Sequence, residues 1–164
     1  MTAELSVKAV TTAAELDSAR ALFTEYGRVI TDVAGRSLEH QGFDRELETL
    51  PGLYAPPRGR MYLACVDGEP IGCAALRPLD RLGPGVGEVK RMYVRPERRG
   101  LGLGHALIRR LVADARQIGY RTLKLDTSTN MLAAQHVYRA AGFVPCERYN
   151  DDPMEDTVWY ELRL

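Results

Sequence analysis

The sequence predicts one layered α/β unit, in which a mixed and mostly antiparallel sheet is flanked by helices. The chain has 164 residues, which is the usual size of a single domain. Apolar runs of strand length alternate with amphipathic helical patterns along the whole chain. Two of these runs are joined by Asp67-Gly68, a strong signal for an antiparallel hairpin. Because no repeat, linker or low-complexity tract divides the chain, we expect residues 1–164 to form one domain.

The N-terminal part is expected to contain a strand over residues 4–10 and then two helices. Thr12 to Glu15 spells a capping box ahead of the first helix, and a shorter helix is expected from Leu38 to Leu50. Residues 51–59 hold three prolines and two glycines, so they should form a loop. Apolar residues recur every three or four positions on the first helix: Leu16, Ala19, Leu22, Phe23, Tyr26, Ile30 and Val33.

The rest of the chain should supply most of the sheet and two further helices. The long helix that follows the expected strand over residues 87–94 carries an apolar stripe and is expected to end at Gly119. The last helix is expected to end at Gly142. The expected strands are residues 61–66, 71–77, 87–94, 121–126 and 157–164, and the last helix is residues 131–141.

Charge and hydropathy exclude several classes of protein. The 22 Lys and Arg balance 22 Asp and Glu, whereas a dedicated nucleic-acid binder usually carries a basic excess, so we expect no nucleic-acid partner. The longest apolar stretches are only a few residues, and the first residues lack the basic and apolar regions of a signal peptide. We therefore expect no membrane span and a cytoplasmic location.

Cysteines and histidines show no metal-ligand spacing, so no metal is expected. The three cysteines lie in strand-like segments and are expected to be buried free thiols of a reducing compartment. The residues concerned are Cys65, Cys73, Cys146, His40, His105 and His136.

The most informative stretch is the loop RPERRGLGLG, which joins the expected strand over residues 87–94 to the long helix. Gly100, Gly102 and Gly104 leave their backbone amides unobstructed, and these amides open a helix whose N-terminus carries positive partial charge. Arg98 and Arg99 add forked donors suited to phosphate. The loop therefore predicts a pyrophosphate site, with a merely tight connection as the alternative.

A dinucleotide- or methyl-donor-binding fold is a competing interpretation, because Asp126 ends the next strand where a ribose-binding acid would sit. Two features oppose it. The glycine spacing would require a third glycine where His105 stands, and the loop follows a hairpin instead of opening a parallel sheet.

With these residues the chain resembles the GNAT superfamily of acyl-CoA-dependent N-acetyltransferases. The family signature Gln/Arg-x-x-Gly-x-Gly/Ala is matched by Arg99, Gly102 and Gly104. Residues 134–143 resemble the family's A-x-x-x-Y-x-x-x-G-F segment. The resemblance covers almost the whole chain and implies a GNAT-type domain with a splayed pair of parallel strands where the cofactor binds.

The resemblance also implies how acetyl-CoA is held. The backbone of Met92, Tyr93 and Val94 would pair with the pantetheine arm, and Asn130 would contact the cofactor, although Asn130 is equally suited to be a helix N-cap. The pyrophosphate would lie on the amides of Gly100, Leu101, Gly102, Leu103 and Gly104, next to Arg98 and Arg99.

Acetyl transfer to an amine needs a proton acceptor and a donor for the leaving thiolate. Glu88 lies eleven residues before Arg99, the spacing at which histone-acetylating relatives place a general base; a solvated charge is the alternative. Tyr138 matches the family's general acid, although it also lies on an apolar helical stripe. The backbone amide near Val94 would stabilise the oxyanion.

The acceptor is expected to be a primary amine of a small molecule or peptide. Residues 147–156 hold five acids and one base, so an acidic rim favouring cationic amines is one hypothesis, with a solvated loop as the alternative. Acyl groups longer than acetyl, a homodimer, and a catalytically degenerate acyl-CoA-binding module all stay open. The second expected helix would add Glu39, Asp44, Glu46 and Glu48 to the rim.

Overall fold

The computed structural model of the chain describes residues 1–35 and 37–164, with all side chains of these residues except those of Val33, Ala34 and His40. The strands form one sheet in the order β1-β2-β3-β4-β5-β7-β6. They are β1 (Leu5–Ala9), β2 (Arg60–Val66), β3 (Glu69–Pro78), β4 (Val86–Val94), β5 (Thr122–Ser128), β6 (Val144–Pro145) and β7 (Thr157–Arg163). The α-helices are α1 (Ala13–Ala34), α2 (Phe43–Thr49), α3 (Leu103–Ile118) and α4 (Leu132–Ala140).

Local signals for α1 and for the first hairpin are confirmed. The Thr12 side chain accepts a hydrogen bond from the Glu15 amide, and the Glu15 carboxylate accepts from the Thr12 amide, which completes the capping box. Asp67 and Gly68 have φ angles of 49° and 81°, which join β2 and β3 by the tight turn that the sequence predicts. Val33 of the predicted apolar face and His40 have side chains outside the described residues.

The second helix is shorter than predicted. Residues Glu39–Gln41 form a turn of 3-10 helix, and Gly42 then adopts a left-handed conformation with φ of 66°. A left-handed residue interrupts the helical hydrogen-bond ladder, so α2 begins only at Phe43. The prediction of one helix from Leu38 to Leu50 is therefore wrong in extent.

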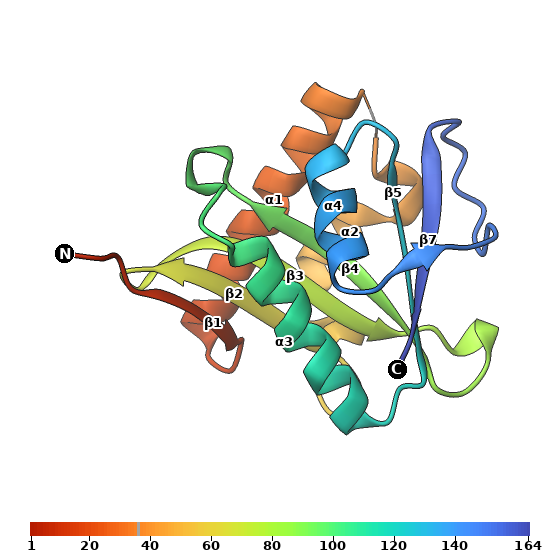
Figure 1. The fold of residues 1–164 in the computed structure, drawn as a ribbon, viewed down its shortest axis with the longest axis horizontal. Helices are drawn as coiled ribbons and strands as arrows, with labels where there is room; N and C mark the ends of the chain where they lie inside the picture. The colour runs from red at the N-terminus through yellow and green to blue at the C-terminus, as the bar shows by residue number, and fades with distance from the viewer. Residues whose placement is uncertain (36) are drawn as a thin grey trace.

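All strand pairs of the sheet are antiparallel except β4 and β5, which run parallel. These two strands pair only from Val86 to Glu88 on β4 and from Thr122 to Lys124 on β5. Beyond that point they diverge, and α4 lies in front of the gap (Figure 1). This mixed sheet confirms the predicted fold class and excludes the doubly wound parallel sheet of the competing interpretation.

Helices cover both faces of the sheet, with α3 and α4 on one side and α1 and α2 on the other (Figure 1). Leu107, Ile108 and Leu111 of α3 are fully buried against one face, and Leu22 and Phe23 of α1 against the other. The two apolar layers hold the central strands, including β4, between them.

The cysteines are all free thiols, as predicted. Cys65 and Cys73 are buried, but Cys146 is partly exposed, so the prediction of three buried thiols is wrong for this residue. Cys146 follows β6, the two-residue strand at the edge of the sheet, whose residues are both exposed.

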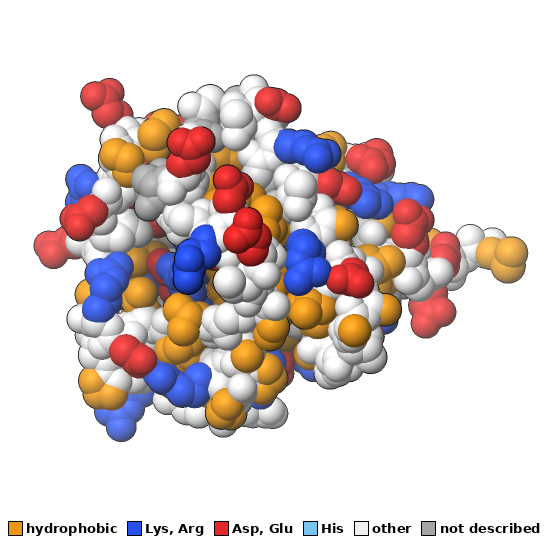
Figure 2. Space-filling model, turned by 180° about the vertical axis from the view of Figure 1, so that it is seen from behind, with side chains coloured by type: hydrophobic (Ala, Val, Ile, Leu, Met, Phe, Trp, Pro, Cys, Tyr) orange, Lys and Arg blue, Asp and Glu red, His pale blue; other side chains and the backbone are white. Residues whose placement is uncertain are grey.

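Charges are interspersed on the face that carries α1 and α2 (Figure 2). Acidic and basic side chains alternate there, without a continuous basic field of the kind that nucleic-acid binders present. Across the described chain, no helix is both long and apolar enough to cross a membrane, and no cluster of three or more His, Cys, Asp or Glu is placed to bind a metal ion.

Candidate active site

A cleft of about 660 Å³ lies beside the gap between β4 and β5. Its walls come from the end of β4, the glycine-rich loop, the first turn of α3, the start of α4 and one side of α1. The sequence-predicted cofactor residues that line it are Met92, Tyr93, Val94, Arg98, Arg99, Gly100, Gly102, Leu103, Gly104 and Asn130. Leu101 is 43% exposed and is not part of this lining.

The end of β4 turns one backbone edge toward the cleft. On its other edge Val94 is the register partner of Gly72, and Tyr93 that of Cys73. Pairing with β5 stops at Glu88, so along the described chain the β5-facing edge of residues 92–94 has no strand partner. An extended amide-bearing ligand could add there as a strand does.

The glycine-rich loop presents backbone amides to the cleft. Gly100 and Gly102 have φ of 84° and 78°, a region that other residues rarely adopt. The first hydrogen bond within α3 runs from the Ala106 amide to the Gly102 carbonyl, so the amides of residues 103–105 precede the helical ladder. A Cβ added at Gly100 or Gly102 would meet no protein atom within 4 Å. This open, donor-rich space fits an anion such as a pyrophosphate.

Asn130 does not cap α4. The N-cap position is Met131, and it makes no side-chain capping bond, so the N-cap interpretation of Asn130 is wrong. The Asn130 amide instead donates to Ser128 Oγ at 3.1 Å, which closes the turn after β5. Its exposed side chain is left free to line the cleft.

A smaller cavity of about 40 Å³ adjoins the cleft and is lined in part by Tyr26 and Ile30 of α1 and by Leu38 and Gln41. It shares part of its wall with the cleft, namely Tyr26, Ile30, Met92, Met131 and Ala134. The rest of its wall is more polar and includes Gln41, Lys90, Asp126, Ser128 and Tyr138. The two spaces therefore meet next to Met92, close to the point where β4 and β5 diverge. We call this point the fork of the sheet.

Tyr138 has its ring in the core and lines the smaller cavity. The residue is 5% exposed, and its ring lies 6.0 Å from that of Phe143. The hydroxyl makes no hydrogen bond to a described residue, yet no side-chain oxygen in the described part of the chain is both fully buried and unpaired. The hydroxyl therefore touches cavity space. Burial raises the pKa of Tyr138, so the phenol is neutral and can donate a proton.

Glu88 is 1% exposed, which rules out the alternative of a solvated charge. Its Oε1 accepts from Arg77 Nε at 2.9 Å and Arg77 Nη2 at 2.7 Å, and its Oε2 accepts from the Tyr149 hydroxyl at 2.6 Å. Burial alone would raise the pKa of this carboxyl, but Lys90, Arg77 and the Tyr149 hydrogen bond outweigh burial and hold the pKa below its ordinary value. Glu88 lines neither cavity.

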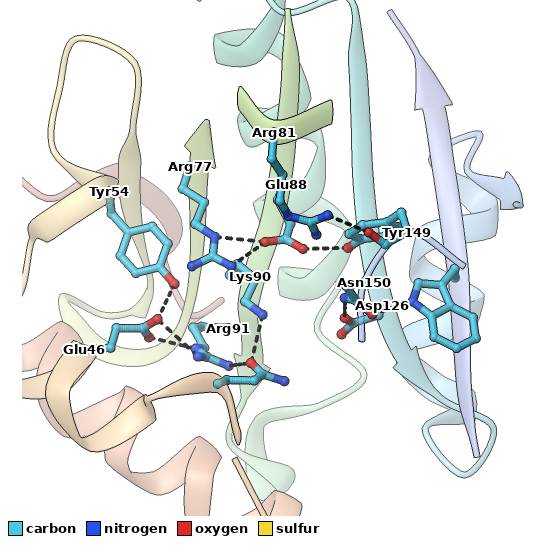
Figure 3. Close-up of polar contacts among 12 residues, drawn as sticks. Glu46, Tyr54, Arg77, Arg81, Glu88, Lys90, Arg91, Asp126, Tyr149 and Asn150 are labelled. Atoms are coloured by element: carbon cyan, nitrogen blue, oxygen red, sulfur yellow. Dashed lines mark hydrogen bonds and ion pairs between the residues drawn. The ribbon is translucent and has the colours of Figure 1, made fainter. Parts of the chain in front are cut away.

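Two further cations stand on β4 beside Glu88 (Figure 3). Arg91, held at a φ of 58° where the β3–β4 register shifts, pairs with Glu46 of α2 through Nε and Oε2 at 2.8 Å. Lys90 donates from Nζ to Gln41 Oε1 at 2.9 Å. Neither residue is among the site residues predicted from the sequence. The period-two alternation of a buried strand would have placed Lys90 on the same side of the sheet as Glu88.

The connection from β6 to β7 folds over the fork. The Asn150 side-chain amide donates to Asp126 of β5 at 2.5 Å, and the Trp159 indole donates to Asn150 Oδ1 at 2.9 Å. Two acids of this connection accept hydrogen bonds within the protein. Asp152 accepts from the Thr157 hydroxyl, and Asp156 accepts from the Ser128 hydroxyl. The exposed acids of this connection are Glu147, Asp151 and Glu155.

Residues 16–143 match the acetyltransferase (GNAT) family. The chain belongs to this family. An uncharacterized N-acetyltransferase of Schizosaccharomyces pombe is 35% identical over 161 residues, covering 98% of this chain and 95% of that protein. A protein of Azospirillum brasilense named IAA acetyltransferase is 33% identical over 141 residues, covering 84% of this chain and 86% of its own.

Solved structures share the GNAT fold. An acetyltransferase of Streptococcus agalactiae superimposes with a TM-score of 0.76 at 18% identity, covering 98% of both chains. A putative acetyltransferase of Salmonella typhimurium, solved with its cofactor acetyl-CoA, gives a TM-score of 0.71 at 18% identity and covers 97% of this chain and 93% of that one. This chain is thus an acetyltransferase of the GNAT family.

Proposed function

We propose that this GNAT acetyltransferase moves an acetyl group from acetyl-CoA to a primary amine of a small molecule or peptide within one ternary complex, and that residues 1–164 form the catalytic domain. The observation that carries the proposal is the meeting of two spaces next to Met92: a wide cleft with an anion-binding loop, and a small polar cavity. Each reactant then reaches the fork from its own side. The aminoglycoside N(6')-acetyltransferase of Stenotrophomonas maltophilia, 35% identical over 123 residues, bears a name that supports a small-molecule acceptor.

The wide cleft is the proposed acetyl-CoA site. The open backbone edge of Met92, Tyr93 and Val94 would hold the pantetheine amides, and Asn130 would contact the same arm. The loop amides of residues 100–104 and the guanidinium groups of Arg98 and Arg99 would neutralise the pyrophosphate. Leu101, which is exposed at the rim, would contribute its backbone amide only.

Acetyl-CoA supplies an activated thioester. In the proposed transfer the amine nitrogen bonds to the acetyl carbon, the carbon–sulfur bond breaks, and the amine gives up a proton while the thiolate gains one. Tyr138 would donate the proton to the sulfur, which its neutral phenol and its place on the cavity wall support. The backbone amide near Val94 would stabilise the oxyanion.

Glu88 is the proposed acceptor of the amine's proton. Its carboxylate is ionised, but Arg77 and Tyr149 occupy it and it lies behind the cavity wall, so the proton would have to reach it through a water molecule. Asp126 is the competing candidate, because its carboxylate lines the cavity itself. The dependence of kcat on pH, measured for Glu88→Gln and Asp126→Asn, distinguishes the two candidates. The variant that lacks the true base is expected to lose activity at and below the pH optimum of the wild type. The other variant is expected to keep the pH profile of the wild type.

The function is tested by release of CoA and formation of the N-acetyl product, with amines of different charge and size. Turnover with at least one primary amine, together with calorimetric binding of CoA, supports the proposal. Binding of CoA without turnover on any amine would identify the chain as an acyl-CoA-binding module instead. The free thiols further support a proposed cytoplasmic location, which fractionation of the source cells would test.

A further inference from the structure

Lys90, a cation that lines the small cavity, makes no ion pair with a described residue. The neighbouring arginines each have a carboxylate partner: Arg77 pairs with the buried Glu88, and Arg91 with the partly buried Glu46. Lys90 is 8% exposed, and its ammonium donates to the neutral amide oxygen of Gln41 at 2.9 Å. Within the described residues no carboxylate lies within ion-pair distance of Lys90 Nζ.

An isolated ammonium in such a place costs free energy, because burial removes its hydration and one amide oxygen replaces only part of it. Burial and the charge of Arg91 lower the pKa of Lys90, and the negative charges of Glu88 and Asp126 only partly oppose this. Binding of an anionic group at Nζ would relieve the cost. Lys90 is one of the residues that line the small cavity, as is its hydrogen-bond partner Gln41.

The same cavity also presents an anion. Asp126 lines the wall, accepts a hydrogen bond from the neutral Asn150 side chain, and makes no ion pair with the described residues. In Figure 3 Lys90 stands between the Glu46–Arg91 pair and the Asn150–Asp126 pair. A cation and an anion on one small wall complement a ligand that itself carries both charges.

We propose that Lys90 binds a carboxylate of the acceptor, so that the acceptor is a small amino acid: an amine and a carboxylate on one molecule. This inference rests on the proposed function and names its substrate class. The volume of about 40 Å³ fits the size, because it admits a group of a few heavy atoms, such as a carboxylate, at the Lys90 end. The amine of the same molecule then faces the fork, where Tyr138 and the end of β4 stand.

Three acids of the predicted rim, Glu46, Asp152 and Asp156, are engaged within the protein. Glu46 is neutralised by Arg91, and Asp152 and Asp156 hold the β6–β7 connection. Acids that remain exposed, such as Asp151, lie outside the cavity wall. The charged residues that line the small cavity are therefore Lys90, Arg91 and Asp126, and the described acids of the rim are not among them.

The test compares amino acids with their own carboxamides as acceptors, using the wild type and the variants Lys90→Met, Lys90→Arg and Lys124→Met. The wild type is expected to prefer the carboxylate form by roughly tenfold to a hundredfold in kcat/KM, the range of one charge-assisted hydrogen bond. Lys90→Met should abolish this preference by raising KM for the acid form alone, and Lys90→Arg should restore part of it. Lys124→Met is the matched control, because Lys124 pairs with Glu161 at 2.6 Å and lines neither cavity; it should keep the preference.

The variants remain interpretable if folding changes, because CoA affinity and the thermal midpoint are measured on each. Replacing a buried unpaired ammonium by Met should not lower the midpoint. Equal rates on acids and carboxamides in the wild type, or an intact preference in Lys90→Met, would overturn this inference while amine acetylation stands. An absence of turnover on every amine, despite CoA binding, would overturn the proposed function and this inference together.

Discussion

Replacing Tyr138 by Phe separates the chemical role of the hydroxyl from the packing role of the ring. The ring is buried against Phe143 and is kept, and the hydroxyl has no hydrogen bond to a described residue that could be lost. We therefore expect the free energy of unfolding to change by less than about 1 kcal/mol. If the hydroxyl is the acid, kcat should fall by about 100- to 10,000-fold, which is about 2.7–5.4 kcal/mol of transition-state stabilisation.

The assay is a steady-state measurement of CoA release with the best amine found, together with calorimetric binding of acetyl-CoA and a denaturant titration. Binding of acetyl-CoA should stay within about twofold of wild type, because Tyr138 lines the small cavity and not the wide cleft. Tyr160→Phe is the control: its hydroxyl accepts from Arg139 and donates to Gln135, so this variant should lose stability and keep its chemistry. A Tyr138→Phe enzyme with wild-type kcat would refute the assignment.

Three further predictions concern the cleft, the first helix and pH. Gly102→Ala should weaken CoA binding at least about tenfold in calorimetry, whereas Gly119→Ala, also at positive φ but far from the cleft, should cost similar stability, about 1 kcal/mol, without changing affinity. Thr12→Ala should lower the free energy of unfolding by about 1 kcal/mol in a denaturant titration and leave CoA affinity unchanged. The pKa of Glu88 is lower in the folded state, so the stabilisation that its carboxylate contributes is present above the unfolded pKa of about 4.3 and is lost as pH falls. Glu88→Gln should therefore be about 2 kcal/mol less stable than the wild type at pH 7. A difference in unfolding free energy between the two proteins that does not narrow at pH 3 would contradict this.

The sequence predicted the elements well where the deciding interactions are local. The capping box of α1 and the Asp67-Gly68 turn each involve residues within a few positions of one another, so the pattern of residue types was sufficient. The extent of α2 was missed because a single left-handed glycine, Gly42, interrupts an otherwise helical pattern. The short strand β6 was missed because two residues leave no periodicity to read.

In the candidate site, too, features that depend on one continuous segment were predicted, and features that depend on distant segments were not. The glycine-rich loop is one continuous segment whose conformation and amides follow from its own residues, and it lines the cleft as predicted. Glu88 was found as a residue, but its environment was not, because Arg77 and Tyr149 reach it from β3 and from the β6–β7 connection. Lys90 was not predicted as a site residue for a related reason. Its side chain contacts Gln41, which lies 49 residues earlier in the chain.

The sequence by itself determined the family, the order of most elements and the position of the glycine-rich loop, since spacing along the chain carries all three. Only the tertiary structure decided which charges remain available. In the sequence Glu46 and Glu88 look like acids open to a substrate, yet each pairs with an arginine of another element, Glu46 with Arg91 and Glu88 with Arg77. Lys90 is left without such a partner because the fork of β4 and β5 opens beside it. Whether a buried charge is paired depends on contacts between segments that are distant in sequence, and these contacts give the acceptor cavity its positive end.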